Sequence, residues 1–215
     1  MKKSVKTFIK ENISFLILII ALFSVRSSLA DWYDVPSGSM EPGIMVGDRI
    51  MVNKVAYTLE FPFTDTVLAN TGNIEKGDIV IIDSSAADMR LVKRVVATAG
   101  DTIALQNNRL YINGERAEWT PSTNGEDLMV EAVAGHQRII KVMPVEPQFP
   151  SFKRITVPEG HILVMGDNRN NSVDSRYYGF IPISEVQGRA FAVAFSLDKE
   201  DNYLPRSDRF FSALL

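Results

Sequence analysis

The chain has 215 residues, 46% of them hydrophobic, which suits one folded domain, or a domain carrying a large insertion, around a buried core. It contains no cysteine, which excludes disulfides, a cysteine nucleophile and a thiolate metal site. The formal net charge of -3 is uneven, because five basic residues and one acidic residue lie in residues 1–30 and residues 31–215 carry -7. This acidity disfavours nucleic acid as a partner.

The first thirty residues predict a membrane helix. Four lysines, the last of them Lys10, precede an uncharged apolar run at residues 13–25, which Arg26 closes. Thirteen residues rise only about 20 Å as a helix, against a hydrocarbon core of about 30 Å, so the span must recruit flanking residues up to position 30. Basic residues before an apolar segment hold that end in the cytoplasm. We therefore expect a cytoplasmic stretch at residues 1–12, one pass through the lipid bilayer of the cytoplasmic membrane at 13–30, and the remainder on the outer, periplasmic side.

The same segment has a second interpretation. Ser28-Leu29-Ala30 resembles a small-x-small cleavage site, so the segment also fits a cleaved signal peptide. Arg26 would then be a charge inside the cleavage region, which favours a retained anchor.

Beyond residue 30, short β-branched runs recur between turn signals, as is typical of strands. The runs are residues 49–53, 78–82, 91–97, 103–105, 109–112, 138–142, 161–165 and 190–196. Gly-Asp pairs begin at positions 47, 77, 100 and 166, and Asn113-Gly114 is a hairpin signal. No helical period of useful length follows the N-terminal segment. The sequence predicts a mostly β protein.

The residue pattern of the chain changes between about Thr102 and Pro158. Turn-rich stretches at residues 120–125 and 144–150 surround weaker strands there. We expect an inserted β subdomain at 102–158, within a β core formed by residues 31–101 and 159–215.

Ser39 lies on a turn shaped by its neighbours. Pro36 fixes its own φ, Gly38 permits a positive φ, and Glu41-Pro42-Gly43-Ile44 has the order of a type II turn. We expect a constrained, exposed bend that presents the Ser39 hydroxyl. Pro-Ser-Gly-Ser is also ordinary loop sequence, so this turn is weak evidence by itself.

A nucleophilic serine needs a base, and the two histidines lie in no motif that activates one. A lysine serves if its pKa falls from about 10.4 by roughly three units, which desolvation achieves. Strand alternation places Lys93 on the same face as Leu91 and Val95. Lys54 and Lys141 also lie in apolar runs and remain competitors at this point.

A third polar segment runs from Gly166 to Arg176. Two charge pairs with a spacing of two residues, Asp167/Arg169 and Asp174/Arg176, place opposite charges on the same side of extended backbone. A calcium loop is the rival interpretation, but Arg169 occupies a ligand position and Tyr178 stands where a bidentate Glu belongs. We reject the metal site.

Taken in order, the basic-flanked apolar segment, Pro36-Ser-Gly-Ser-Met40, Lys93-Arg94 and the segment Gly166 to Arg176 resemble bacterial type I signal peptidases (leader peptidases). The resemblance extends from the anchor to about Ser196. Two departures are mild: Asn170 stands where an acidic residue is common, and Tyr178 where Trp is often found.

The resemblance implies a role for each matching position. Ser39 would be the nucleophile and Lys93 its general base. Ser37 would join the Ser39 backbone N–H in stabilising the oxyanion, and Ser172 would orient Lys93. Four charged residues would support the site: Asp167, Arg169, Asp174 and Arg176.

The implied fold is a membrane-anchored, mostly antiparallel β catalytic core with an inserted second β subdomain. The implied activity is endopeptidase removal of signal peptides from exported preproteins, after small-x-small sites and without a metal or cofactor. Val35, Pro36 and Val92, which are small apolar residues beside the nucleophile and the base, would wall the substrate pocket. Small residues would then be required at positions -1 and -3 from the cut.

Two alternatives remain open. One is a Ser/Lys peptidase dedicated to a single secretion or conjugation system. The other is a non-catalytic anchored β module that binds peptides at a sheet edge. Self-cleaving Ser/Lys repressors are disfavoured, because they carry a DNA-binding domain in place of a membrane segment.

Overall fold

The computed structural model describes residues 11–64, 66–143 and 151–214. The fold is mostly β and antiparallel, which confirms that part of the prediction. The strands are β1 (Ala30–Asp34), β2 (Asp48–Asn53), β3 (Thr58–Glu60), β4 (Val67–Asn70), β5 (Ile79–Ser84), β6 (Met89–Thr98), β7 (Thr102–Gln106), β8 (Arg109–Ile112), β9 (Glu115–Arg116), β10 (Glu118–Pro121), β11 (Leu128–Val133), β12 (His136–Lys141), β13 (Phe152–Thr156), β14 (His161–Met165), β15 (Ile181–Pro182), β16 (Val186–Asp198), β17 (Leu204–Pro205) and β18 (Ser212–Ala213). The helices are α2 (Ile13–Ser28), α3 (Ser175–Tyr178), η1 (Lys54–Ala56), η2 (Ile183–Glu185) and η3 (Ser207–Arg209).

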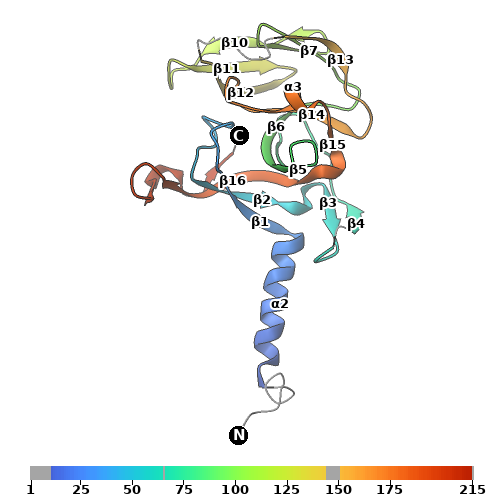
Figure 1. The fold of residues 1–215 in the computed structure, drawn as a ribbon, viewed down its shortest axis with the longest axis vertical. Helices are drawn as coiled ribbons and strands as arrows, with labels where there is room; N and C mark the ends of the chain where they lie inside the picture. Colours follow the sequence, from blue (N-terminus) through green and yellow to red (C-terminus); the bar gives the residue numbers. More distant parts are fainter. Residues whose placement is uncertain (1–10, 65, 144–150, 215) are drawn as a thin grey trace.

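One large sheet organises the molecule, with strand order β1-β2-β16-β5-β6-β14-β15 and with β17 and β18 paired to β16 (Figure 1). Its strands alternate apolar side chains between two buried clusters. Leu91 and Val95 of β6 belong to one cluster, with Val80 of β5. Val92 of β6 packs against the other, which contains Ile81 of β5. This period of two is what the β-branched runs predicted.

Residues 102–158 form two further sheets, β13-β7-β8-β9 and β10-β11-β12, above the large sheet in Figure 1. Their apolar side chains share a buried cluster with the large sheet, in which Leu105 and Val133 meet Val96 of β6 and Met165 of β14. The segment is thus packed against one face of β6 and β14. The division into a core and an inserted subdomain remains our prediction.

Helix α2 extends away from the sheets (Figure 1). Its apolar side chains, among them Phe15, Ile17 and Phe23, are exposed. No helix within the described residues is both long and apolar enough to cross a membrane. The helix is also shorter than the expected span of residues 13–30. It stops at Ser28, and Ala30 is already the first residue of β1, where it pairs with Asn53.

Candidate active site

Ser39 lies in the turn between β1 and β2. The pairing of these strands continues to the edge of the turn, where Val35 N–H donates to Asp48 O at 3.0 Å. The turn closes through Glu41 N–H, which donates to Gly38 O at 3.2 Å. Ser39 is only 8% exposed, so the expected exposed bend is wrong at this residue. The cause is Met40, which is fully buried in an apolar cluster and draws the turn inward.

Lys93 reaches this serine from β6. Its Nζ donates to Ser39 Oγ at 2.8 Å and to the Val92 carbonyl at 3.1 Å, and the side chain is buried. Burial lowers the pKa of Lys93 from 10.5 to about 8; the Asp174 carboxylate opposes this shift and the Arg176 guanidinium adds to it. The structure therefore brings together the two residues that the sequence singled out.

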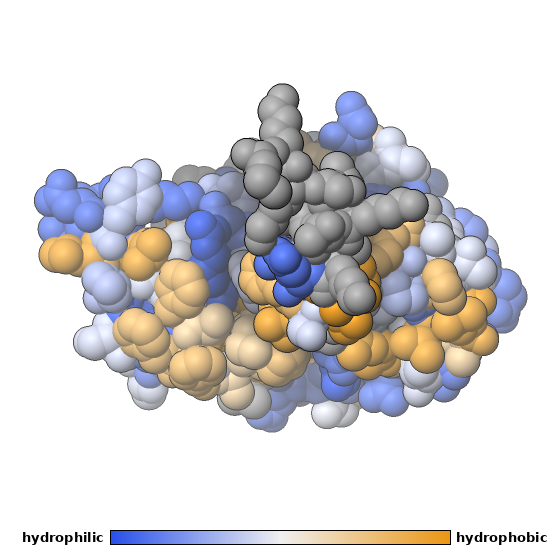
Figure 2. Space-filling model, turned by 90° about the horizontal axis from the view of Figure 1, so that it is seen from below, coloured by the Kyte–Doolittle hydropathy of each residue, from blue (hydrophilic) through white to orange (hydrophobic). Residues whose placement is uncertain are grey.

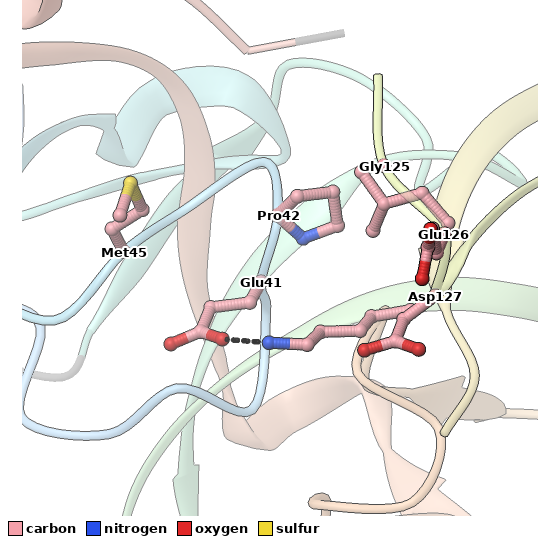
Figure 3. A pocket seen from close by; sticks show the side chains of 8 residues that line it. Glu41, Pro42, Met45, Gly125, Glu126 and Asp127 are labelled. Atoms are coloured by element: carbon pink, nitrogen blue, oxygen red, sulfur yellow. Dashed lines mark hydrogen bonds and ion pairs between the residues drawn. The ribbon is translucent and has the colours of Figure 1, made fainter. Parts of the chain in front are cut away.

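The competing lysines are occupied elsewhere. Lys54 Nζ donates to the Ser27 carbonyl at the end of α2. Lys141 Nζ forms an ion pair with Glu41 Oε2 at 2.9 Å. Figure 3 shows this ion pair beside a pocket of about 280 Å³ that Glu41, Pro42 and Asp127 help to line. Neither amine is hydrogen-bonded to Ser39.

Asp174 is the hub of the loop that follows β14. Its carboxylate accepts from Gly166 N at 2.9 Å, from Ser172 Oγ at 2.8 Å and from Arg176 Nε at 2.8 Å. Burial alone would raise the pKa of Asp174, but Arg176 and the other donors hold it below its ordinary value. The Asp174/Arg176 pair therefore forms as its spacing suggested. The Ser172 hydroxyl donates its hydrogen bond to the Asp174 carboxylate. Among the described residues, no hydrogen bond joins Ser172 to Lys93.

Asp167 and Arg169 do not pair with each other, although their spacing had suggested it. Asp167 accepts from Arg94 Nε at 3.0 Å and Nη2 at 2.8 Å, because β14 pairs with β6 so that Met165 lies opposite Arg94. Arg169 instead reaches Glu131 of β11, donating to Oε1 at 2.7 Å. The loop is thus joined to β6 through Asp167 and to the sheet β10-β11-β12 through Arg169.

Asn168 is a contact that the sequence did not reveal. Its backbone N–H donates to the Ser39 carbonyl at 3.1 Å, and its Nδ2 donates to the Gly38 carbonyl at 3.0 Å. An asparagine in a polar loop carries no pattern that would predict these bonds. Their effect is to fix the two peptide groups on either side of the Ser39 side chain, one from Gly38 to Ser39 and one from Ser39 to Met40.

The predicted pocket residues surround the same turn. Val35 is buried, Val92 is half-buried, and Pro36 is exposed next to the exposed Ser37. The site therefore offers a hydroxyl in contact with an amine of lowered pKa, beside an accessible stretch of backbone. Among the described residues, no group of three or more His, Asp or Glu side chains is placed to hold a metal ion.

Comparison with known proteins identifies the family. The sequence pattern described as "Signal peptidase, peptidase S26" matches residues 6–195. Signal peptidase I from Pseudomonas aeruginosa is 34% identical over 91% of this chain and 76% of that protein. Signal peptidase I P from Bacillus subtilis subsp. natto is 33% identical over 86% of this chain and 87% of that protein.

A solved signal peptidase I from Enterococcus faecalis V583 is 28% identical, with a TM-score of 0.35 over 54% of this chain and 96% of that one. The assignment rests on the sequence matches alone. The chain belongs to the signal peptidase family, peptidase S26, and is a serine endopeptidase.

Proposed function

We propose that this enzyme removes signal peptides from exported preproteins, with Ser39 as nucleophile and Lys93 as general base. The observation that carries the proposal is the 2.8 Å hydrogen bond between Lys93 Nζ and Ser39 Oγ in a buried site. A hydroxyl beside a neutral amine is an activated nucleophile. The relatives that match most of the chain are named signal peptidase I, which supports the substrate class.

The reaction follows from the position of the two groups. Neutral Lys93 accepts the proton of the Ser39 hydroxyl as Oγ bonds to the scissile carbonyl carbon. The tetrahedral intermediate then collapses, the C–N bond breaks, and the Lys93 ammonium returns its proton to the leaving amine. Water attacks the resulting ester with Lys93 again as base. This step releases the carboxylate of the signal peptide and restores the Ser39 hydroxyl.

Ser37 would stabilise the oxyanion together with the backbone N–H of Ser39. Ser37 is an exposed residue two positions before the nucleophile, next to the Gly38 and Ser39 carbonyls that Asn168 holds. A donor aimed at the oxyanion acts mainly in the transition state. Ser37→Ala should therefore lower kcat by roughly 100- to 1000-fold with little change in KM. An unchanged kcat would reduce Ser37 to a residue of the turn.

A substrate strand can bind beside β6. Strand β14 pairs with β6 from Thr98 back to Arg94, and no described strand continues on that side along residues 89–93. An extended peptide added there would pass Ser39, and alternate side chains would face the enzyme. Val35, Pro36 and Val92 would wall the pocket for positions -1 and -3. This arrangement favours cleavage after small-x-small sequences.

The loop after β14 would hold the reacting groups in place. Asp167 grips β6 through Arg94, next to Lys93, and Asp174 binds Ser172 and Arg176. We propose that Ser172 helps to orient the Lys93 side chain. Ser172 packs against Gly166, and this glycine also lies against the Ser39 backbone, since a Cβ added to Gly166 would come within 2.5 Å of the Ser39 carbonyl oxygen. Arg169 would support the loop by tying it to Glu131 of β11.

Residues 13–30 would anchor the enzyme in the cytoplasmic membrane, with residues 1–12 in the cytoplasm and the sheets on the outer side. The apolar surface does not stop at α2, since the β3–β4 hairpin beside its end exposes Phe61, Phe63 and Leu68. Phe63 N–H donates to Ser27 Oγ, so this hairpin touches the helix. Figure 2, which views the molecule from the α2 side, shows hydrophobic residues spread over this face. Such a surface suits contact with lipid.

The proposal is tested by incubating the purified full chain with a preprotein and sequencing the new N-terminus. We expect a single cut after a small-x-small sequence. We also expect no cut by Ser39→Ala protein whose thermal unfolding matches that of the wild type. Cleavage at scattered sites, or cleavage by the Ser39→Ala protein, would contradict the proposal. Processing of only one among many preproteins would indicate the dedicated peptidase instead.

A further inference from the structure

Glu41 covers the glycine that precedes the nucleophile. A Cβ added to Gly38 would collide with Glu41 Oε1 and lie 2.9 Å from Glu41 Cδ. The Glu41 N–H also donates to the Gly38 carbonyl at 3.2 Å. Gly38 does not adopt a positive φ, so the missing side chain at this position leaves space for Glu41 and does not serve an unusual backbone conformation. The turn thus holds a carboxylate against the residue next to Ser39.

The peptide group between Gly38 and Ser39 carries one of the two proposed oxyanion donors. Its carbonyl oxygen, on Gly38, accepts from Glu41 N–H and from Asn168 Nδ2. Among the described residues its N–H, on Ser39, has no hydrogen-bond partner. The carbonyl and the N–H of a trans peptide point in opposite directions, so the bonds that hold the carbonyl also aim the N–H. Glu41 is therefore part of what orients this donor.

The closeness of Glu41 to the donor creates an electrostatic problem. Its carboxylate lies against Gly38, one residue from the Ser39 N–H, where the proposed reaction develops negative charge. Like charges repel, and the repulsion is stronger in a partly buried site than in bulk water. An unpaired carboxylate at this position would therefore oppose the formation of the oxyanion.

Lys141 supplies the counter-charge. Its Nζ lies 2.9 Å from Glu41 Oε2, with 29% and 26% of the two side chains exposed (Figure 3). The pocket beside this ion pair is also lined by two further acidic residues, Glu126 and Asp127. Lys141 is the one basic residue among the described residues that line it. The neutralisation of Glu41 in this acidic pocket therefore depends on Lys141.

The backbone of Lys141 is held together with its side chain. Its N–H donates to the Asp167 carbonyl at 2.9 Å, and its own carbonyl accepts from Arg169 N–H at 2.9 Å. These bonds join the end of β12 to the loop after β14, whose Asn168 holds the turn of Ser39. Lys141 is thus a residue of the sheet β10-β11-β12 that is fixed relative to the catalytic turn.

We propose that Lys141 is a positioning residue of the reaction, which neutralises Glu41 so that this carboxylate braces the turn of Ser39 without opposing the oxyanion. The proposal rests on the proposed function, because it requires an oxyanion beside Ser39. Loss of the lysine leaves an unpaired negative charge near the oxyanion, whereas loss of the carboxylate removes that charge. A purely structural ion pair would make the two losses equivalent.

The test measures kcat and KM of the full chain in detergent on a short soluble peptide that is uncharged near the cut. Lys141→Met should lower kcat roughly 10- to 100-fold with little change in KM, because the repulsion acts on the transition state. Glu41→Gln, which keeps the shape of the side chain, should stay within about threefold of the wild type, since the partly exposed Lys141 remains solvated. The double variant should recover to within about threefold of Glu41→Gln, because the two residues are coupled.

Salt provides a second readout that a structural role would not move. Between 0.1 and 1 M NaCl the Debye length falls from about 10 to about 3 Å, so the kcat of Lys141→Met should rise relative to the wild type. Lys141→Arg keeps the charge and should stay within about threefold of the wild type. The matched control is Lys76→Met, which removes the lysine of the Lys76–Asp101 pair, 3.1 Å long and also partly exposed. Its kcat should stay within about twofold of the wild type.

Two results would overturn the inference. One is a Lys141→Met protein whose kcat is within about twofold of the wild type, less than the repulsion of one nearby charge predicts. The other is a Glu41→Gln protein that loses as much kcat as Lys141→Met, with a double variant no better than either, which is the behaviour of a structural bridge. A wild type that does not cleave the peptide would instead refute the proposed function, so the two failures are distinguishable.

Discussion

Lys93 combines burial with an ionisable amine, and this combination sets its chemistry. With a pKa of about 8, roughly a tenth of the Lys93 amines are neutral at pH 7, and most are neutral above pH 9. The burial that lowers the pKa comes from the strand face that Lys93 shares with Leu91 and Val95, both buried. The amine thus becomes a base because of where β6 places it.

The first prediction concerns the pH dependence of cleavage. Protonation of Lys93 removes the base, so kcat/KM should fall about tenfold for each pH unit below about pH 8 and level off above it. Lys93→Arg should be inactive throughout, since a guanidinium does not deprotonate in this range. The measurement is kcat/KM on a soluble peptide between pH 6 and 9. A flat profile there would be incompatible with Lys93 as the base.

The second prediction concerns stability. The pKa of Lys93 lies below its unfolded value, so at pH 7 the folded state carries a desolvated ammonium. Replacing it in Lys93→Met should raise the free energy of unfolding by up to about 3 kcal/mol at pH 7. The gain should shrink as the pH rises from about 8 to 10.5, where both states become neutral. Urea unfolding at pH 7 and pH 10 measures it, and a destabilised Lys93→Met at pH 7 would contradict the account.

Residue types on a strand or a turn could be recognised from the sequence, whereas their partners could not. Ser39 and Lys93 were identified by turn chemistry, strand alternation and resemblance. The partner of Asp167 could not be predicted, because spacing along one segment says nothing about Arg94 on the neighbouring strand. Asn168 was missed because its contacts are with backbone carbonyls of another loop, which leave no trace in residue type.

At the scale of elements, strand β11 and the loop after β14 meet through one buried carboxylate. Glu131 is fully buried and accepts from Arg169, Arg138 and the Trp119 indole. Burial would raise the pKa of Glu131, but the two guanidiniums lower it to about 2. The sheets of residues 102–158 are thereby tied to the loop that carries Asp174.

The third prediction removes this carboxylate. Glu131→Gln should lower the free energy of unfolding by about 3 to 5 kcal/mol, because Arg138 and Arg169 would remain buried without their counter-charge. The matched control is Asp83→Asn in the exposed Asp83–Arg90 pair, which should cost less than about 1 kcal/mol. Urea unfolding at pH 7 compares them. Equal losses for the two variants would show that the buried cluster has no special role.

The difference in unfolding free energy between the wild type and Glu131→Gln should also change with acid in a defined direction. The pKa of Glu131 is depressed from 4.5 to about 2 in the folded state, so its contribution is present above pH 4.5 and is lost as the pH falls toward 2. The deficit of Glu131→Gln relative to the wild type should therefore shrink over this range. A deficit that grows on acidification would contradict this assignment.

Strong periodic elements were predictable from the sequence, and short ones were not. β8 and β14 fall where their β-branched runs placed them, and the Asn113-Gly114 turn joins β8 to β9. β1 was missed because residues 30–34, with two aspartates, have no apolar alternation, and the strand exists through its pairing with β2. Long-range pairing overrides local composition at such positions.

At the scale of the whole molecule, the structure is a helix joined to a large antiparallel sheet, with two smaller sheets packed beyond the active site (Figure 1). The resemblance seen in the sequence and the family match agree along most of the chain. The sequence did not predict that Lys54 and Phe63 both donate hydrogen bonds to Ser27 near the end of α2. Its apolar neighbours in the sequence favoured Lys54 only as a competitor of Lys93 for the role of base.

The central claim is that Ser39 and Lys93 act as one catalytic unit. It is tested most directly by measuring kcat/KM on a soluble peptide for Ser39→Ala, Lys93→Ala and the double variant. Each single variant should lose activity by several orders of magnitude, and the double variant should be no worse than either single, because a nucleophile without its base is as ineffective as no nucleophile. Substantial activity in Lys93→Ala, or a double variant whose loss is the product of the two single losses, would contradict the claim.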